Sequence, residues 1–141
     1  MINLIKSLLV DIIYNGILRA ISYIYWNYRD VRINLSSRIS IDAKLGKKCS
    51  FIHYSIITSD VTIGEYSYGS FVQIQNADIG SYCSIAPGVK IGLDEHDINN
   101  FSTHPSTYDG KLFMSKIGKT NIGSHVWIGA NAVILSGVIT Q

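Results

Sequence analysis

Residues 121–138 read NIGSHVWIGANAVILSGV, and a large aliphatic residue recurs in them at every sixth position: Ile122, Ile128 and Ile134. Four positions after each of these isoleucines, the sequence has a smaller apolar residue. The upstream stretch DIGSYCSIAPGVKIG, residues 78–92, has the same spacing. A period of six does not fit an α-helix, whose apolar face repeats about every three to four residues. The pattern therefore indicates short strands separated by tight corners.

The hexads continue upstream over most of the chain. Their anchors are Ile33, Ile39, Leu45, Phe51, Ile57, Ile63, Ile79, Ile85, Ile91, Ile122, Ile128 and Ile134. A short fixed repeat buries its hydrophobic face only by stacking on its neighbours, so we expect a solenoid. Three hexads would close one coil of about 18 residues, which places Ile33 beneath Phe51.

The repeat in residues 78–92 and 121–138 resembles that of the hexapeptide-repeat family. The resemblance covers residues 33–139 apart from one insertion, and it implies an all-β solenoid, a left-handed parallel β-helix. We expect an N-terminal amphipathic α-helix over residues 1–30 and a β-helix domain over 31–141, with a loop insertion at 93–121. Relatives continue past ILSGV with more hexads, so we also expect that C-terminal coils are missing from this chain.

Composition limits the class of protein. The chain has 141 residues, 47% of them hydrophobic, and a net charge of +2, which suits one domain with a continuous core. No basic cluster interleaved with aromatic residues is present, so we expect no nucleic-acid partner. Cys49 and Cys83 both fall on small inward positions and are expected to be buried and unbridged. This cysteine usage favours a reducing, cytoplasmic location.

Residues 2–28 are strongly apolar, but Lys6, Asp11 and Arg19 interrupt them, which argues against a membrane-spanning helix. Polar residues recur here every three or four positions, as on one face of a helix: Asn3, Ser7, Asp11, Asn15, Arg19 and Ser22. The apolar face could pack against the β-helix or a neighbouring subunit. It could instead lie in the interface of a membrane, as a peripheral contact at its inner face. The helix could also cap the first coil.

Two breaks interrupt the hexads. Ile63 and Ile79 lie 16 residues apart where 18 would keep the register, so we expect an irregular corner between them. That corner reflects either decay of the repeat or a reshaped face lining an acceptor site. The second break, residues 92–121, is a long polar and aromatic insertion that contains two of the four histidines, His96 and His104. Insertions of this length in a compact repeat are usually functional.

Within the hexapeptide-repeat family, this insertion resembles that of the xenobiotic (chloramphenicol and streptogramin) and polysaccharide O-acetyltransferases. Their loop carries a histidine, a few residues and then Ser-Thr-x-Pro; here these are His96, the residues DINNF, and Ser102 to Pro105. The resemblance implies that His96 is the catalytic residue and that His104 occupies a variable position. A base with a pKa near neutral suits the transfer of an acetyl group from a thioester to a hydroxyl.

The same resemblance implies acetyl-CoA as co-substrate, bound between adjacent β-helices of a homotrimer. The segment VWIGANA, residues 126–132, matches the part that lines this groove, so Trp127, Gly129 and Ala130 are the candidate cofactor-binding residues. We expect Trp127 at an outward corner, where it either stacks on the cofactor or packs between subunits. His53 and His125 are expected to be structural, pointing outward or toward a neighbouring subunit.

The leading hypothesis is therefore an acetyl-CoA-dependent O-acetyltransferase acting on a hydroxyl of a sugar or surface-polysaccharide precursor. The alternatives are antibiotic O-acetylation and a truncated, non-catalytic β-helix scaffold. The carbonic anhydrase branch of this fold uses zinc histidines in a close H-x4-H spacing. His96 and His104 are eight residues apart, and that spacing is absent, so no metal site is expected.

Overall fold

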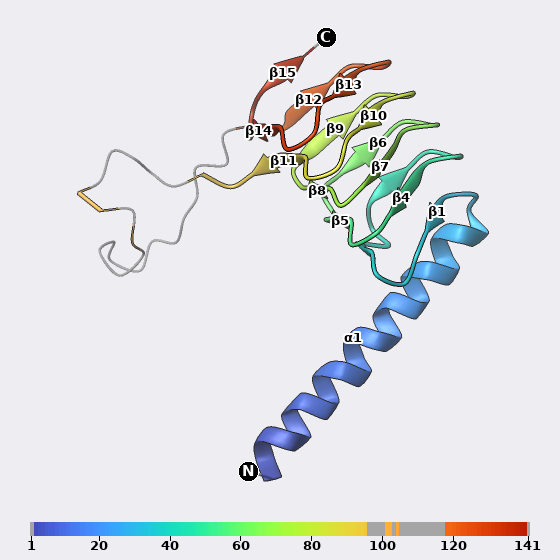
Figure 1. Cartoon of the computed structure of the whole chain (residues 1–141), viewed down its shortest axis with the longest axis vertical. Coiled ribbons are helices and arrows are strands. Elements are labelled where there is room, and N and C mark those ends of the chain that lie inside the picture. The colour runs from blue at the N-terminus through green and yellow to red at the C-terminus, as the bar shows by residue number, and fades with distance from the viewer. Residues whose placement is uncertain (1, 96–100, 103, 105–117, 141) are drawn as a thin grey trace.

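The computed structural model describes residues 2–95, 101, 102, 104 and 118–140, with side chains from Ile12 onward. In this part of the chain a single long helix, α1 (Ile2–Tyr28), precedes fifteen short strands, β1 to β15. Figure 1 shows the strands stacked in successive coils, with α1 at one end and the C-terminus at the other.

The strands form three parallel sheets of five strands each, one on each face of the solenoid. We name them sheets A, B and C in the order in which the chain visits them. Sheet A contains β1 (Arg32–Ile33), β4 (Ser50–Ile52), β7 (Tyr68–Ser70), β10 (Ser84–Ile85) and β13 (Trp127–Ile128). Sheet B contains β2 (Arg38–Ile39), β5 (Ile56–Ile57), β8 (Gln73–Ile74), β11 (Lys90–Leu93) and β14 (Val133–Leu135). Sheet C contains β3 (Lys44–Leu45), β6 (Thr62–Ile63), β9 (Ala77–Ile79), β12 (Thr120–Ile122) and β15 (Ile139–Thr140).

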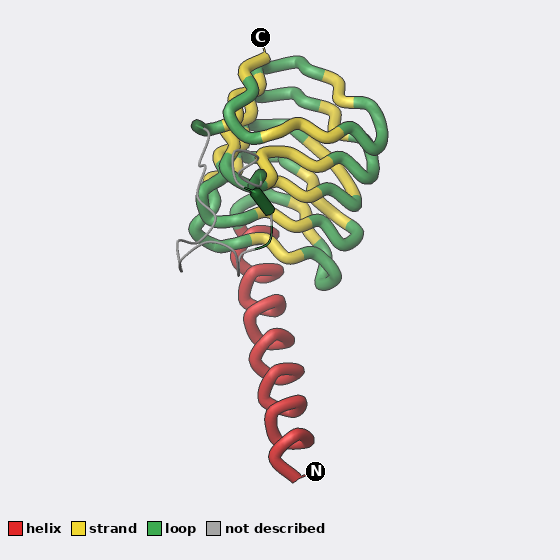
Figure 2. Tube along the Cα trace, turned by 90° about the vertical axis from the view of Figure 1, so that its left-hand side faces the viewer, coloured by secondary structure: helices red, strands yellow, loops and turns green. Residues whose placement is uncertain are grey.

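The fold is thus a left-handed parallel β-helix of about five coils; the hexads predicted the stacked coils, and the resemblance implied their handedness. The predicted register is also confirmed, because Ile33 pairs with Phe51 in the coil above. The anchors fill the interior, where Phe51 is fully buried. Cys49 and Cys83 are buried at the small inward positions, as expected. Figure 2 shows the stack of coils from the side.

The third coil contains the irregularity that the spacing predicted. Gly69, Ile74 and Ile79 lie above Phe51, Ile57 and Ile63, so two sides of this coil have five residues instead of six. Each shortened side places its small inward residue three positions after the anchor rather than four. The buried side chains of Val72 and Ala77 occupy these positions.

The helix α1 caps the first coil with its last turns only. Trp26 is buried against the coil, and Ser22 Oγ donates a hydrogen bond of 2.6 Å to the carbonyl of Ile39. A residue of the predicted polar face therefore contacts the β-helix, while apolar residues such as Ile17 and Ile24 stay exposed. The cap was predicted, but the β-helix does not bury the apolar face. Within the described residues, no helix has an apolar stretch long enough to cross a membrane.

Candidate functional site

The insertion interrupts the fourth coil at the edge between sheets B and C, because it separates β11 from β12. These strands extend one residue at the start and two at the end into the predicted 93–121 range. His96, the predicted catalytic residue, lies outside the described residues. His104 is exposed, and its amide donates a 3.1 Å hydrogen bond to Ser102 Oγ.

The chain enters the insertion through Gly92. Its φ is +67°, and an added Cβ would lie 2.0 Å from the carbonyl oxygen of Gln75 in the coil below. The pairing of β11 with β14 shifts register between Ile91 and Leu93. Such an irregularity turns a strand out of its sheet, so the departure of the insertion is built into the backbone here.

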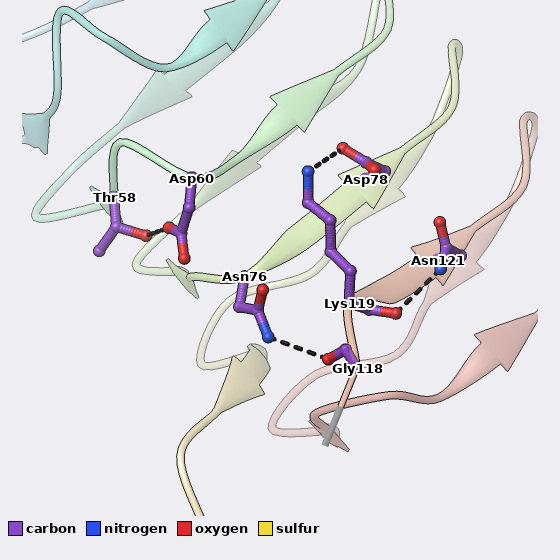
Figure 3. Close-up of polar contacts among 7 residues, drawn as sticks. All are labelled: Thr58, Asp60, Asn76, Asp78, Gly118, Lys119 and Asn121. Carbon is purple, nitrogen blue, oxygen red and sulfur yellow. Dashed lines mark hydrogen bonds and ion pairs between the residues drawn. The ribbon is translucent and has the colours of Figure 1, made fainter. Parts of the chain in front are cut away.

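The chain returns through a cluster of polar contacts at the same edge (Figure 3). Asn76 Nδ2 and Ser136 Oγ each donate a 3.0 Å hydrogen bond to the carbonyl of Gly118. Lys119 Nζ lies 2.6 Å from Asp78 Oδ1. The donors and the carboxylate come from the coils on both sides, so the exit of the insertion is fixed to the third and fifth coils.

The ion pair with Lys119 affects the acidity of Asp78. Partial burial of the carboxyl group opposes its ionisation, but hydrogen bonds from Lys119 and Thr62 stabilise the carboxylate more strongly. The pKa of Asp78 is consequently lower than its usual value. Asp78 therefore stays ionised at neutral pH, and the anchor of the insertion keeps its charge pair.

A polar hollow of about 330 Å³ adjoins this anchor on the edge between sheets B and C. Its lining includes Ser59, Asp60, Thr62, Asn76 and two lysines, Lys44 and Lys119. These side chains supply hydroxyl, carboxylate, amide and ammonium groups. Such a lining can donate hydrogen bonds to, and accept them from, a molecule that carries several hydroxyl groups. The sequence gives no sign of this hollow, because its residues come from separate coils.

A second groove, of about 240 Å³, lies on the outer face of sheet A. Tyr68, Ser84 and Trp127 are register partners in adjacent strands, so the two aromatic side chains flank a small residue. Trp127 is 77% exposed. It points outward, as predicted, but it lies on strand β13 rather than at a corner. The position before each inward anchor belongs to a strand, which explains the difference.

The other two predicted cofactor-binding residues follow Trp127 on the same coil. Gly129 directly follows the buried anchor Ile128 in the fifth coil. Ala130 is exposed and precedes a corner at Asn131, where φ is 60°. The structure thus brings Trp127, Gly129 and Ala130 together on one accessible segment.

The insertion begins after β11 and ends before β12, at the edge between sheets B and C. The three sheets form the three faces of the coil, and this edge is opposite the face of sheet A. The hydrophobic core therefore lies between the ends of the insertion and the sheet A groove.

His53 and His125 lie at corners and are exposed, as expected for residues that point outward. His53 stacks on Phe71, with ring centroids 5.7 Å apart. His125 stacks on Tyr82, with ring centroids 5.0 Å apart. These ring contacts occupy one face of each imidazole.

Comparison with known proteins adds no assignment. No protein-family model matches the chain, and no curated protein is significantly similar to it in sequence.

Proposed function

We propose that this chain is an acetyl-CoA-dependent O-acetyltransferase that acetylates a hydroxyl of a sugar or surface-polysaccharide precursor. One observation carries the proposal. A left-handed β-helix is interrupted, at an anchored edge, by a polar insertion that contains His96 and the Ser102–Pro105 motif. This combination is what the resemblance to the hexapeptide-repeat acetyltransferases rests on.

His96 is the general base of the proposed reaction. Its neutral imidazole removes the proton from the acceptor hydroxyl as the oxygen attacks the thioester carbonyl carbon. The tetrahedral intermediate collapses by breaking the carbon–sulfur bond, and the thiolate leaves with a proton returned by the imidazolium. The products are the acetyl ester and free CoA thiol. The thioester is already activated, so the chain needs no nucleophile of its own.

The sheet A groove is the proposed site for acetyl-CoA. The indole of Trp127 offers an exposed face for stacking, and Gly129 and Ala130 follow it on the same coil. Because the groove lies opposite the edge where the insertion begins and ends, the proposed complete site takes the insertion from a neighbouring subunit. This arrangement supports the homotrimer that the resemblance implies.

The polar hollow favours a sugar over an apolar antibiotic as acceptor. Ser59, Asp60 and Lys44 are suited to hydrogen bonding with a polyhydroxylated molecule, and the hollow adjoins the base of the insertion. An antibiotic acceptor would use the same base and donor, so an acceptor panel containing both classes separates the two hypotheses.

Calorimetric titration with acetyl-CoA is the first test. We expect saturable binding by the 141-residue chain and a loss of at least about tenfold in affinity for Trp127→Ala, because the stacking surface is removed. Tyr54→Ala, which removes an exposed aromatic ring outside the groove, is the matched control. Unchanged affinity in Trp127→Ala would remove the groove from the proposal.

Acetyl transfer then tests the base, with release of CoA thiol measured against a panel of sugars and antibiotics. His96→Ala should lower kcat about 10²- to 10⁴-fold, while His104→Ala stays within a few-fold of the unsubstituted chain. Full activity in His96→Ala would show that the assignment of the base is wrong.

A further inference from the structure

The exposed apolar side chains of α1 form a continuous surface. Ile13, Ile17, Ile21 and Ile24 are 57%, 55%, 47% and 67% exposed. Their spacing of four, four and three residues places them along one side of the helix. We call these four residues the apolar arc of α1. Isolated exposed apolar residues are ordinary, but a continuous surface of this kind indicates an interaction site.

The β-helix leaves this arc uncovered. The closest packing of α1 is against β1 and β2, through the side that carries Ser22 and Trp26. The rest of the helix projects away from the coils (Figures 1 and 2). Within the described part of the chain, the arc therefore has no protein surface over it.

Charge is distributed unevenly along the chain. Residues 1–48, which form α1 and the first coil, contain eight Lys and Arg but only three Asp and Glu. Residues 49–141 contain four Lys and Arg and seven Asp and Glu. The end of the molecule that carries the apolar arc is thus basic, although the net charge of the whole chain is only +2.

A groove of about 390 Å³ between α1 and the first two coils combines both properties. Arg19 and Arg38 line it together with the apolar side chains of Leu18, Ile21 and Ile56. Among the described residues, neither guanidinium forms an ion pair with a carboxylate. Ile21 belongs to both the groove and the apolar arc, so the two surfaces are continuous.

We propose that α1 and the first coil bind the surface of an anionic phospholipid bilayer. The apolar arc enters the interface between headgroups and acyl chains, and the groove takes an anionic phosphate headgroup between Arg19 and Arg38. An apolar helix surface next to basic residues is the pattern that binds such membranes. Pairing of α1 with a second copy would cover the arc, but it would place like-charged basic ends together.

The proposal goes beyond acetyl transfer and does not depend on it. The proposed membrane-binding surface includes neither His96 nor Trp127. Failure of one proposal therefore leaves the other unaffected.

Vesicle flotation of the full 141-residue chain tests the proposal. We expect the protein to float with vesicles of phosphatidylcholine and phosphatidylglycerol, and much less with vesicles of phosphatidylcholine alone. High salt should weaken the binding, because it screens the basic residues. Equal binding to both kinds of vesicle, or binding to neither, would overturn the proposal.

Two pairs of variants locate the surface. The double variant Ile17→Glu/Ile21→Glu should abolish flotation, whereas Ile139→Glu, which changes an exposed residue in the last coil, should leave it intact. Arg19→Gln and Arg38→Gln should each weaken binding to the anionic vesicles about fivefold. Lys90→Gln, an exposed lysine on the same sheet as Arg38 but in the fourth coil, is the matched control.

Analytical ultracentrifugation tests whether a second copy of the chain, rather than a bilayer, covers the apolar arc. We expect the oligomer of the Ile17→Glu/Ile21→Glu variant to have the same mass as that of the unsubstituted chain, with unchanged far-UV circular dichroism. A smaller oligomer, combined with no vesicle binding by the unsubstituted chain, would show that α1 pairs with other copies and would refute the membrane proposal.

Discussion

Single residues determine where this β-helix can bend. Gly92 and Gly129 both follow an inward anchor, so the hexad pattern treats them alike. In the structure, Gly92 has a positive φ and lies against Gln75, whereas the φ of Gly129 lies outside the left-handed region. The sequence showed that glycine follows several anchors, but it could not separate a glycine that the backbone conformation requires from one that it does not. That difference depends on the local φ.

Gly92→Ala should lower the free energy of unfolding by at least about 2 kcal/mol, because the left-handed conformation and the contact with the Gln75 carbonyl both disfavour a Cβ. Gly129→Ala should change it by less than about 0.5 kcal/mol. Urea denaturation followed by circular dichroism measures both. Equal effects of the two substitutions would show that the close contact at Gly92 does not constrain the coil.

At the scale of elements, the corner between sheets C and A carries a column of stacked rings. Tyr66, Tyr82 and His125 lie in successive coils, with centroids 5.0 Å apart and nearly parallel planes. All three have φ close to +60°, a conformation that is unfavourable for residues other than glycine. The ring contacts help to stabilise these corners, and hydrogen bonds between coils, such as the one from the amide of Tyr82 to the carbonyl of Glu65, add to them.

This column could not be recognised from the sequence, although its anchors could. Each of the three rings follows a sheet C anchor by three residues. The shortened third coil and the insertion make the intervals between the rings unequal, so they show no period. The orientation of α1 could not be predicted either, because the regular spacing of its polar residues does not show which side of the helix contacts the β-helix. The fold and most of its core could be predicted from the sequence. The polar hollow and the sheet A groove could not, because their side chains come from separate coils.

Replacing the middle ring tests the column. Tyr82→Ala removes two ring contacts and keeps the unfavourable φ, so it should lower the free energy of unfolding by about 2 kcal/mol. Tyr82→Phe keeps both contacts and should differ from the unsubstituted chain by less than about 0.5 kcal/mol. Denaturant unfolding at equilibrium measures the difference. A stable Tyr82→Ala variant would mean that the stacked rings contribute little and that the hydrogen bonds between coils hold the corner.

At the scale of the whole molecule, the three surfaces are distributed around and along one β-helix. The basic end with α1 lies at the first coil, the insertion leaves the fourth, and the groove with Trp127 occupies the face opposite that insertion. At about 4.8 Å per coil, the insertion begins roughly 15 Å from the first coil. A chain bound to a membrane through α1 would therefore hold the coil from which the insertion leaves about 15 Å from the first coil and its membrane-binding helix.

The opposite placement of insertion and groove leads to a prediction about assembly. If each acetyl-transfer site takes His96 from one copy and Trp127 from its neighbour, His96→Ala and Trp127→Ala damage different subunits of the same site. Oligomers formed from an equal mixture of the two variants then contain some sites in which both residues are intact. For random assembly of a closed ring, about one quarter of the sites are complete, because each of the two subunits must be of the right kind.

The measurement is thiol release from acetyl-CoA by the two variants, alone and after denaturation and refolding together, with an acceptor that the unsubstituted chain uses. At acetyl-CoA concentrations well below saturation, we expect His96→Ala alone to be nearly inactive and Trp127→Ala alone to keep about one tenth of full activity. The refolded mixture should recover about one quarter of full activity. The variants mixed without refolding are the control, because their subunits do not exchange on the time scale of the assay. Recovery that never exceeds the sum of the two separate activities would show that one copy holds a complete site, and the insertion would then have to reach around its own β-helix.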